Sequence, residues 1–595
     1  MLTLSQVYKS PSAFLCALLA AGVSLADVRP GSSCDPLCKS VPGSAGWPST
    51  ETWASLNEST GGRLLRPSPP GAVCHSGQPT FDNATCRGVQ AGWTSYEFHD
   101  ADPVSVDWNQ YSNDSCLPDP HYPCSGEGYP VFVINATTAE HVKLGVDFAR
   151  EHHIRLIVKS SGHDFIGRSI APNSLSIWTH HMTGLQTHEG FQPKSCKVTI
   201  DGGAVTAGAG SAMAELYGAL GSINRTVIGG GGKTVSLGGY LTGAGHSLLS
   251  SRYGLATDQV LEMEVVTPKG EILTINECSH QDLFWAMRGG GGSTFAIMTS
   301  VTVKTFPSPR LACGDIIVAT DANSFAAKSV PDLAAYVVSQ FPDLGDAGMS
   351  GYSYILRDFP NPYDPSSGSV AGFYASMCIQ DTQDTTEFLT LWNPIFKHIN
   401  ETWPGFSIVP NLANFTSFSG WYAVNYDKST TGTDSYVGSR LLDKKALTSN
   451  VTALAAALDR LSSGGTATAF LVSGKGVMDA KPRGGGDAVN PAWRKAYVHS
   501  TFGVEFEPLN ASAKAEALQK INYMLEPMRE LAPDMGAYMN EANPEEPDWQ
   551  HQFWGDHYGR LVEIKRDVDP QDVLWCTPCV GNERWKEHDG MLCRV

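Results

Sequence analysis

The chain has 595 residues, of which 60 are acidic and 42 are basic, so its net charge is −18 with histidine counted as neutral. This balance argues against a protein that binds the phosphate backbone of nucleic acids, because such binding needs many cationic contacts. The hydrophobic share of 42% can fill the cores of two or three domains, and the 60 glycines indicate tight turns or close backbone approaches.

Residues 1–26 have the features of a secretory signal peptide. Lys9 supplies the positive charge, residues 13–21 form a short apolar run, and Ser24-Leu25-Ala26 precedes a cleavage site after Ala26. No later segment reaches the ~18 apolar residues that a membrane span requires. Nine Asn-X-Ser/Thr sequons follow, at Asn57, Asn83, Asn113, Asn135, Asn224, Asn400, Asn414, Asn450 and Asn510. We therefore expect a secreted protein that carries N-linked glycans and has no membrane span.

The cysteines are concentrated near the N-terminus. Six of those that remain after cleavage precede residue 125, which predicts disulfides that fasten a segment with little core of its own. Removal of Cys16 with the signal leaves 13 cysteines, so at least one is unpaired within the chain. Cys576-Thr-Pro-Cys579 has the spacing of a redox motif, but no thioredoxin-like pattern surrounds it, and we expect a structural role.

The predicted elements divide the mature chain into four parts. Residues 27–125, rich in Pro, Gly, Ser and Cys, form a loop-rich extension. Residues 126–307 alternate strands (130–134, 155–158, 259–268 and 295–304) with helices such as 138–149, which begins after Thr137 or Thr138. Residues 308–530 hold strands at 314–320, 350–356, 466–472 and 498–506 and an amphipathic helix at 451–461, which fits a sheet with helices on one face. Residues 531–595 are aromatic and rich in motifs.

Glycine-rich loops occur throughout the second part, but they do not fit the common nucleotide-binding patterns. Gly208-Ala209-Gly210 and Gly243-Ala244-Gly245 lack the third glycine of a dinucleotide fingerprint, and Gly232-Lys233-Thr234 lacks the first glycine of a P-loop. Several loops of bare backbone N–H groups remain, and such loops can hold a pyrophosphate without those folds.

Several motifs recur in the order of one known family. Lys159-Ser160-Ser161-Gly162-His163-Asp164 follows a strand, and glycine-rich loops come next at 229–247 and 282–291. Tyr538-Met539-Asn540-Glu541, His557-Tyr558-Gly559-Arg560-Leu561, Lys565 and Asp569-Pro570 follow near the end. From about residue 126 to 580, the chain resembles the berberine-bridge-enzyme-like branch of the vanillyl-alcohol oxidase and p-cresol methylhydroxylase superfamily. The resemblance implies an α+β fold with a two-part FAD-binding domain, formed by 126–307 and the returning C-terminal segment, and an inserted substrate domain at 308–530.

The resemblance also implies how FAD is held. A single covalent bond is expected from His163 to the 8α-methyl group of the flavin, which would prevent cofactor loss and raise its potential. Gly232 stands where many relatives have a cysteine that forms a second bond, so an oligosaccharide oxidase is less favoured. Val235 falls where the family controls access of dioxygen and resembles the oxidases. The other residues expected to contact FAD are Lys159, Ser160, Ser161, Gly162, Asp164, Gly167, Ser169, Gly231, Gly232, Thr234, Val235, Gly238, Gly239, Gly243, His246, Gly291, Ile297, Tyr538 and Asn540.

Oxidation of an alcohol needs a base that takes the hydroxyl proton while hydride leaves for the flavin. Tyr538 and Asn540 resemble the family's pair beside the flavin, and Asp487 lies near a position where relatives have an acidic residue. We expect an oxidase that takes hydride from an alcohol or a similarly activated C–H group of a small molecule and reduces dioxygen to hydrogen peroxide. The alternatives are an FAD dehydrogenase or oxidative cyclase of secondary metabolism, and a flavin-free binding protein. No metal site is expected, and the sequence leaves the substrate and the oligomeric state open.

Overall fold

The computed structural model describes residues 38–361, 366, 368–588 and 590–595. The predicted signal peptide, Cys16 and Cys34 lie outside the described residues. By its contacts the chain divides into a large unit within residues 40–582 and a small unit, whose described residues are 38–39, 583–588 and 590–595. In the small unit, strands β20 (Trp585–His588) and β21 (Met591–Arg594) form a hairpin, and a disulfide joins Cys38 to Cys593.

The large unit begins with the N-terminal segment, which has more helix than the sequence suggested. Helices α2 (Thr50–Ser59), α3 (Asn83–Gly92) and α4 (Tyr96–Ala101) each start at a residue whose side chain accepts a backbone N–H of the first turn: Ser49, Asp82 and Ser95. Side chains of this kind satisfy the free N–H groups at the start of a helix. Disulfides Cys74–Cys86 and Cys116–Cys124 fasten the segment, as predicted.

A first sheet, in the order β1-β2-β4-β3, combines this segment with the chain that follows. Strands β2 (Phe132–Asn135), β3 (Arg155–Lys159) and β4 (Ser174–Trp178) are parallel, and β1 (Leu64–Leu65) is antiparallel to β2. Between β2 and β3 lies helix α5 (Ala139–Glu151), whose first turn is capped by Thr138. The predicted strands at 130–134 and 155–158 and the predicted helix are confirmed.

A second sheet is antiparallel, in the order β5-β6-β10-β8-β9. Its strands are β5 (Leu185–Phe191), β6 (Ile200–Gly208), β8 (Val260–Val266), β9 (Ile272–Asn276) and β10 (Ile297–Lys304), so the predicted strands at 259–268 and 295–304 are confirmed. Helices α6 (Met213–Gly221), α7 (Leu237–Gly243), α8 (Ser250–Tyr253) and α9 (Gln281–Ala286) belong to this region. Two-residue strands β7 (Arg225–Thr226) and β11 (Phe306–Pro307) pair with each other.

The third sheet is antiparallel and eight-stranded, with the order β15-β12-β14-β13-β17-β19-β16 and with β18 between β13 and β19. Its strands are β12 (Leu311–Asp321), β13 (Met349–Pro360), β14 (Ser369–Gln380), β15 (Ser407–Phe415), β16 (Asp434–Asp443), β17 (Ala467–Thr468), β18 (Phe470–Leu471) and β19 (Ala496–Phe506). The strand predicted at 466–472 is therefore divided in two. The other three predicted strands of this region are confirmed.

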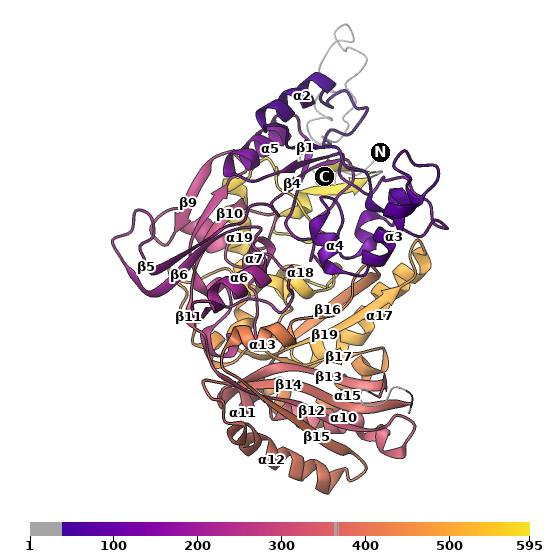
Figure 1. Cartoon of the computed structure of the whole chain (residues 1–595), viewed down its shortest axis with the longest axis vertical. Helices are drawn as coiled ribbons and strands as arrows, with labels where there is room; N and C mark the ends of the chain where they lie inside the picture. The colour runs from indigo at the N-terminus through magenta and orange to yellow at the C-terminus, as the bar shows by residue number, and fades with distance from the viewer. Residues whose placement is uncertain (1–37, 362–365, 367, 589) are drawn as a thin grey trace, which may run out of the picture. The chain divides into compact units, whose positions relative to one another are not determined.

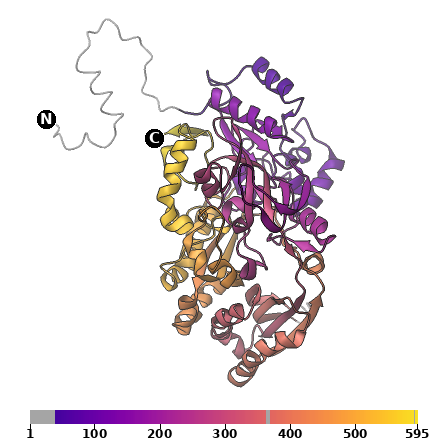
Figure 2. The same cartoon turned by 90° about the vertical axis from the view of Figure 1, so that its left-hand side faces the viewer.

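Helices pack on this sheet: α10 (Val330–Ser339) on β14, α12 (Thr385–Thr402) on β12 and β15, α15 (Val451–Ser463) on β13, and α17 (Ala511–Leu531) on β16 and β19 (Figure 1). Figure 2 shows the same helices and strands after a turn of 90° about the vertical axis. The side chains of β14 alternate, because successive residues of a strand point to opposite faces. Phe373 and Met377 join the core with the helices, while Tyr374 and Ser376 line a cavity. The predicted α+β fold, with a helix-covered antiparallel sheet, is confirmed.

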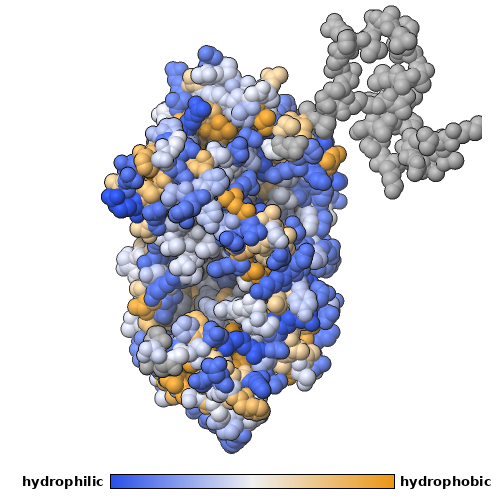
Figure 3. Space-filling model, turned by 90° about the vertical axis from the view of Figure 1, so that its right-hand side faces the viewer, coloured by the Kyte–Doolittle hydropathy of each residue, from blue (hydrophilic) through white to orange (hydrophobic). Residues whose placement is uncertain are grey.

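The C-terminal part of the large unit holds helices α18 (Trp549–Trp554) and α19 (Tyr558–Val568). Three further disulfides join Cys196 to Cys278, Cys313 to Cys378 and Cys576 to Cys579, and no described cysteine is free. Among the described residues, no helix combines the length and apolar character needed to cross a bilayer. On the face drawn in Figure 3, hydrophobic residues form scattered groups among hydrophilic ones.

Candidate active site

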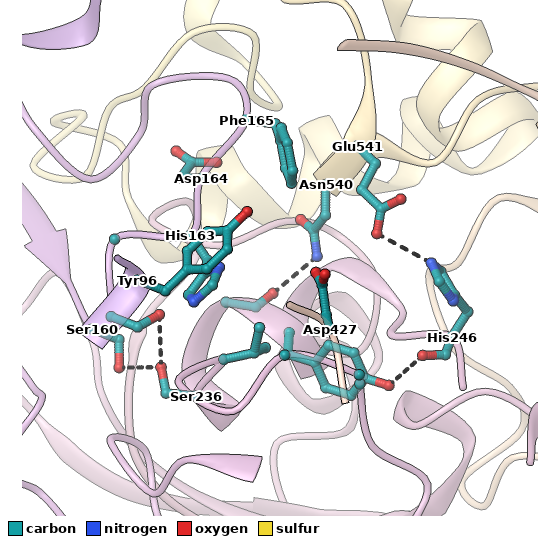
Figure 4. Close-up of a pocket in the computed structure, with 18 of the residues that line it drawn as sticks. Tyr96, Ser160, His163, Asp164, Phe165, Ser236, His246, Asp427, Asn540 and Glu541 are labelled. Carbon is teal, nitrogen blue, oxygen red and sulfur yellow. Dashed lines mark hydrogen bonds and ion pairs between the residues drawn. The ribbon is translucent and has the colours of Figure 1, made fainter. Parts of the chain in front are cut away.

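A cavity of about 640 Å³ in the large unit collects the predicted motifs. One wall is the loop after β3, which carries His163, and another is the glycine-rich loop before α7. The third sheet contributes Tyr352, Tyr354 and Tyr374, and the segment after α17 contributes Tyr538, Asn540 and Glu541. Figure 4 shows several of these side chains turned toward one another around the cavity.

Most of the residues predicted to contact FAD line this cavity. They are Ser160, Ser161, Gly162, His163, Asp164, Ser169, Gly231, Gly232, Val235, Gly238, Gly239, His246, Ile297, Tyr538 and Asn540. Six predicted site residues lie outside the lining: Lys159, Gly167, Thr234, Gly243, Gly291 and Asp487. Two of these six lie directly against residues that line the cavity. Thr234 Oγ1 is 2.6 Å from His163 Nε2, and Gly243 leaves room for Asn540, because a Cβ there would lie 2.2 Å from the Asn540 amide nitrogen.

Lys159 points away from the cavity. It is fully buried, and its Nζ donates to the backbone carbonyls of His99 at 3.1 Å and Asp102 at 2.9 Å. Burial lowers the pKa of Lys159 to about 8, although the neighbouring carboxyl groups oppose that shift. The side chain therefore ties the N-terminal segment to the end of β3.

His163 is held on three sides. Its ring is stacked on Tyr96, with centroids 4.5 Å apart and planes 16° apart (Figure 4). Nδ1 lies 3.2 Å from Asp107 Oδ2, opposite the contact of Nε2 with Thr234. Burial lowers the pKa of His163 to about 3, so the imidazole is neutral and keeps a nitrogen lone pair at physiological pH.

Asn540 connects two parts of the site. Arg168, which is paired with Asp164, donates to Asn540 Oδ1 at 3.0 Å, and Asn540 Nδ2 donates to Tyr538 Oη, also at 3.0 Å. Burial and then the charge of Glu541 raise the pKa of Tyr538 above its ordinary value. This direction is opposite to the one that a tyrosine base would need.

Glu541 lies between two histidines. Its Oε1 is 3.1 Å from His246 Nε2, and its Oε2 is 3.7 Å from Nδ1 of the fully buried His499 (Figure 4 draws the contact with His246). Burial raises the pKa of Glu541, but the charge and hydrogen bond of His246 outweigh burial, and the net pKa lies below the ordinary value. Burial lowers the pKa of His499 to about 3. The cavity therefore holds one ionised carboxylate beside a buried neutral imidazole.

Asp487 occupies a different place from the one that the sequence suggested. Both of its oxygens are 3.0 Å from Arg494 Nη2, and Asp258 contacts the same guanidinium at 2.7 and 2.9 Å. Two buried carboxylates thus share one arginine, which accounts for Asp487 without a role in catalysis. Burial and then the charge of Asp487 raise the pKa of Asp258 to about 7.

The Asp258 carboxyl predicts a pH dependence of stability. Its pKa is higher in the folded chain than in the unfolded one, so its contribution is complete below about pH 4 and is lost as the pH rises through about 7. We expect Asp258→Asn to reduce the fall in Tm between about pH 5 and pH 8, measured by circular dichroism. Asp282→Asn, which removes an exposed ion pair with Arg560, is the control and should leave that fall unchanged. An equal fall in wild type and Asp258→Asn would contradict this account.

The residues of the cavity fit the FAD that the sequence implied. Bare backbone is exposed at Gly231, Gly232, Gly238 and Gly239, and a Cβ at Gly239 would meet no atom within 4 Å. Backbone N–H groups of such loops suit the phosphates of a dinucleotide. Ser236 Oγ lies 2.6 Å from Ser160 Oγ, which adds hydroxyl groups to the same wall.

Gly232, the position without the second attachment cysteine, lies beside the histidine. A Cβ there would be 3.8 Å from His163 Cε1 and 3.0 Å from Val235 Cγ2. A side chain at position 232 would therefore lie next to His163. Glycine has no sulfur atom there that could form a second bond to a cofactor.

Sequence reasoning did not identify several residues of the site. Tyr96 and Asp107 come from the N-terminal segment, where isolated polar residues give no motif. Glu541 stands directly after the predicted Asn540, and only its contacts with His246 and His499 distinguish it. Ligand atoms of these last three residues lie within 4.8 Å of one another, close enough to hold a metal ion, although the bond between His246 and Glu541 accounts for two of them without one.

Two family models and several known proteins match this chain. Residues 130–276 match the family described as "FAD binding domain", and residues 537–580 match that described as "Berberine and berberine like". The FAD-linked oxidoreductase apf9 of Gibberella fujikuroi is 34% identical over 580 residues, which cover 94% of this chain and 97% of that protein. The bifunctional decalin synthase calF of Penicillium decumbens is 32% identical over 582 residues, covering 94% and 96%.

Among solved structures, the VAO-type flavoprotein MtVAO713 of Myceliophthora thermophila C1 superposes with a TM-score of 0.87 at 27% identity. The match covers 94% of this chain and 100% of that one. The cavity and the glycine loops thus lie in a fold and sequence shared with flavoenzymes. The chain belongs to the FAD-linked oxidoreductases of the vanillyl-alcohol oxidase and p-cresol methylhydroxylase superfamily, in its berberine-bridge-enzyme-like branch.

Proposed function

We propose that the chain is a secreted oxidase that carries FAD on His163, takes hydride from an alcohol or a similarly activated C–H group, and passes the electrons to dioxygen. The observation that carries the proposal is the convergence of His163, the bare glycine loops and an ionised Glu541 on one cavity. FAD bound there would supply the hydride acceptor. The FAD-binding domain would comprise 126–307 with the segment from 531, and the substrate domain 308–530.

Proton transfer is assigned to Glu541. A carboxylate that lies in the cavity and is ionised at neutral pH can accept the hydroxyl proton of a substrate, whereas the raised pKa of Tyr538 disfavours its phenolate. His246 fixes one oxygen of Glu541 and leaves the other, near His499, less constrained. Tyr538 and Asn540, which were predicted as catalytic, would then position the substrate through the pair that they form.

The walls of the cavity favour an aromatic substrate. Tyr352, Tyr354, Tyr374 and Phe470 line it from the third sheet, and Tyr426 lines it from a neighbouring loop. Aromatic side chains of this kind stack against planar rings while their hydroxyl groups stay available for hydrogen bonds. The single attachment predicted from Gly232 points in the same direction, toward smaller or aromatic substrates rather than oligosaccharides.

Dioxygen is the expected electron acceptor because Val235 lines the cavity at the position where the sequence resembles the oxidases. An oxidative cyclase that makes a carbon–carbon bond is the second candidate, and it is favoured by the similarity to the decalin synthase calF.

The test is a substrate panel on purified, yellow protein. We expect aromatic primary alcohols to give the fastest turnover, with one hydrogen peroxide formed for each alcohol oxidised. Turnover with an artificial electron acceptor but without peroxide would replace the oxidase by a dehydrogenase. A product of unchanged oxygen content with a new ring would instead identify a cyclase.

Secretion and glycosylation are part of the proposal. Seven of the nine sequon asparagines are exposed, whereas Asn57 and Asn135 are half-buried. Glycans are therefore expected at Asn83, Asn113, Asn224, Asn400, Asn414, Asn450 and Asn510.

A further inference from the structure

Asp107 is a buried carboxyl group whose surroundings do not satisfy it. Its side chain is 1% exposed, and within the described part of the chain neither of its oxygens has a hydrogen-bond partner of good geometry. The nearest nitrogen in an ion pair with it is His163 Nδ1, 3.2 Å from Oδ2. A buried polar group without partners costs free energy, so the position of Asp107 calls for a role at His163.

The backbone of Asp107 is fixed on both sides. Its N–H donates to the carbonyl of Gly162 at 3.5 Å, and its own carbonyl accepts from Gly432 N at 2.9 Å and Thr431 Oγ1 at 2.5 Å. Gly162 has φ of +105°, and a Cβ there would lie 3.4 Å from the backbone of Ser105. The segment before Asp107 therefore packs closely on the loop of His163.

Tyr96 comes from the same N-terminal segment and covers one face of the imidazole. Both residues lie outside the two regions that match the known families, 130–276 and 537–580. The N-terminal segment thus builds one side of the histidine's environment, and the ring is prevented from rotating by a stacked face and a contact at each nitrogen.

A neutral imidazole carries one N–H and one lone pair. To form a bond to carbon and end neutral, the ring must lose that proton, whichever nitrogen forms the bond. Burial raises the pKa of Asp107 well above its ordinary value and lowers that of His163 to about 3, so a proton shared between the two groups is held by the carboxylate. Asp107 is placed to receive the proton without help from solvent.

We propose that Asp107 is the proton acceptor that lets His163 form its covalent bond to the flavin, an inference that rests on the attachment included in the proposed function. In this step an imidazole nitrogen bonds to the 8α-methyl carbon, and one C–H bond of that methyl group breaks. The two electrons of the C–H bond reduce the isoalloxazine, and dioxygen then takes them up. The imidazole proton passes through Asp107, and with the methyl proton it ends in hydrogen peroxide.

The test compares Asp107→Asn with wild type. Asparagine keeps the size of the side chain but cannot take the proton, so we expect covalent attachment to slow by about 10²-fold or more. Purified protein is incubated with FAD, and the covalent fraction is followed over time by flavin fluorescence in a denaturing gel. His163→Ala gives the zero level. Asp434→Asn is the matched control, because Asp434 is also 1% exposed and, among the described residues, also lacks a hydrogen-bond partner, but it lies outside the cavity lining; this variant should attach FAD at the wild-type rate.

A small acid distinguishes proton transfer from mere support of the fold. In Asp107→Ala, added formate fits the space left by the carboxyl group and should restore attachment in proportion to its concentration, whereas chloride should not. Asp107→Glu, which keeps a carboxylate, should also attach FAD faster than Asp107→Asn.

Two results would overturn the inference in different ways. If wild type holds FAD that denaturation releases, the attachment itself is wrong, and the part of the proposed function that names His163 fails with it. If wild type attaches FAD and both Asp107→Asn and Asp107→Ala do so at the same rate without formate, Asp107 has no such role and the proposed function stands. The inference would also be contradicted if Asp107→Ala needed formate in order to fold and its rate of FAD attachment then did not increase with the formate concentration.

Discussion

Glu541→Gln is expected to lower kcat by about 10²- to 10⁴-fold, the range that a positioned general base contributes. Glutamine keeps the contact with His246 Nε2, which lies 3.1 Å from Glu541 Oε1, but it cannot accept a proton. The flavin spectrum and the covalent fraction should remain those of wild type, because His163 and the glycine loops lie on other walls of the cavity. The measurement is anaerobic reduction of the flavin by an aromatic alcohol, followed by stopped-flow absorbance.

The pH profile supplies a second readout. The pKa of Glu541 in the folded protein lies below its ordinary value. Glu541 is therefore ionised and able to accept a proton above this lowered pKa, and it loses that ability as the pH falls through it. Glu541→Gln should lack this acid limb. Tyr538→Phe is the comparison. The Tyr538 hydroxyl accepts a hydrogen bond from Asn540 at 3.0 Å, and in the proposed function it positions the substrate and does not take its proton. If Tyr538→Phe abolishes the acid limb and Glu541→Gln keeps it, the assignment of the base is wrong.

Local patterns predicted much of the fold because their causes are local. Thr138 caps α5 through its own side chain, and the alternation along β14 follows from the geometry of a strand. The motif around His163 likewise lies within a few residues, and the structure places it at the cavity. The order of the motifs along the chain then led to the family, which the comparisons confirm.

The partners of these residues could not be predicted, because they come from distant parts of the chain. Asp107 meets His163 through a segment without any motif, and His499 meets Glu541 from β19. Asp487 shows the converse. Its place in the sequence suggested catalysis, but Arg494, seven residues later, holds it in a buried ion pair. Whether an acidic side chain lines the cavity or forms an ion pair elsewhere depends on tertiary packing. A single sequence does not show that packing.

Lys565→Met is expected to lower the free energy of unfolding by about 3–5 kcal/mol, the cost of leaving one partner of a buried ion pair alone. Lys565 is 3% exposed and Asp569 is 1% exposed, with Nζ 2.7 Å from Oδ2. Nζ also donates to the carbonyls of Thr294 at 2.9 Å and Leu574 at 2.7 Å. The side chain therefore connects α19 to the glycine-rich loop that ends at Thr294 and whose Gly292 lines the cavity. The measurement is unfolding in urea, followed by tryptophan fluorescence.

Lys565 and Asp569 belong to the C-terminal motifs that led to the family. The structure explains their presence by a buried ion pair that stabilises the fold. Lys397→Met is the matched control, because Lys397 and Glu401 form a pair of the same spacing on α12 but are 75% and 63% exposed. Exposed pairs contribute little, so this variant should unfold at the wild-type urea concentration. Lys565→Met combined with Asp569→Asn removes both charges but keeps an oxygen for the backbone N–H of Val573, and it should regain part of the loss, since the unpaired charge is what costs most. Equal effects of Lys565→Met and Lys397→Met would show that burial of the pair does not stabilise the loop beside the cavity.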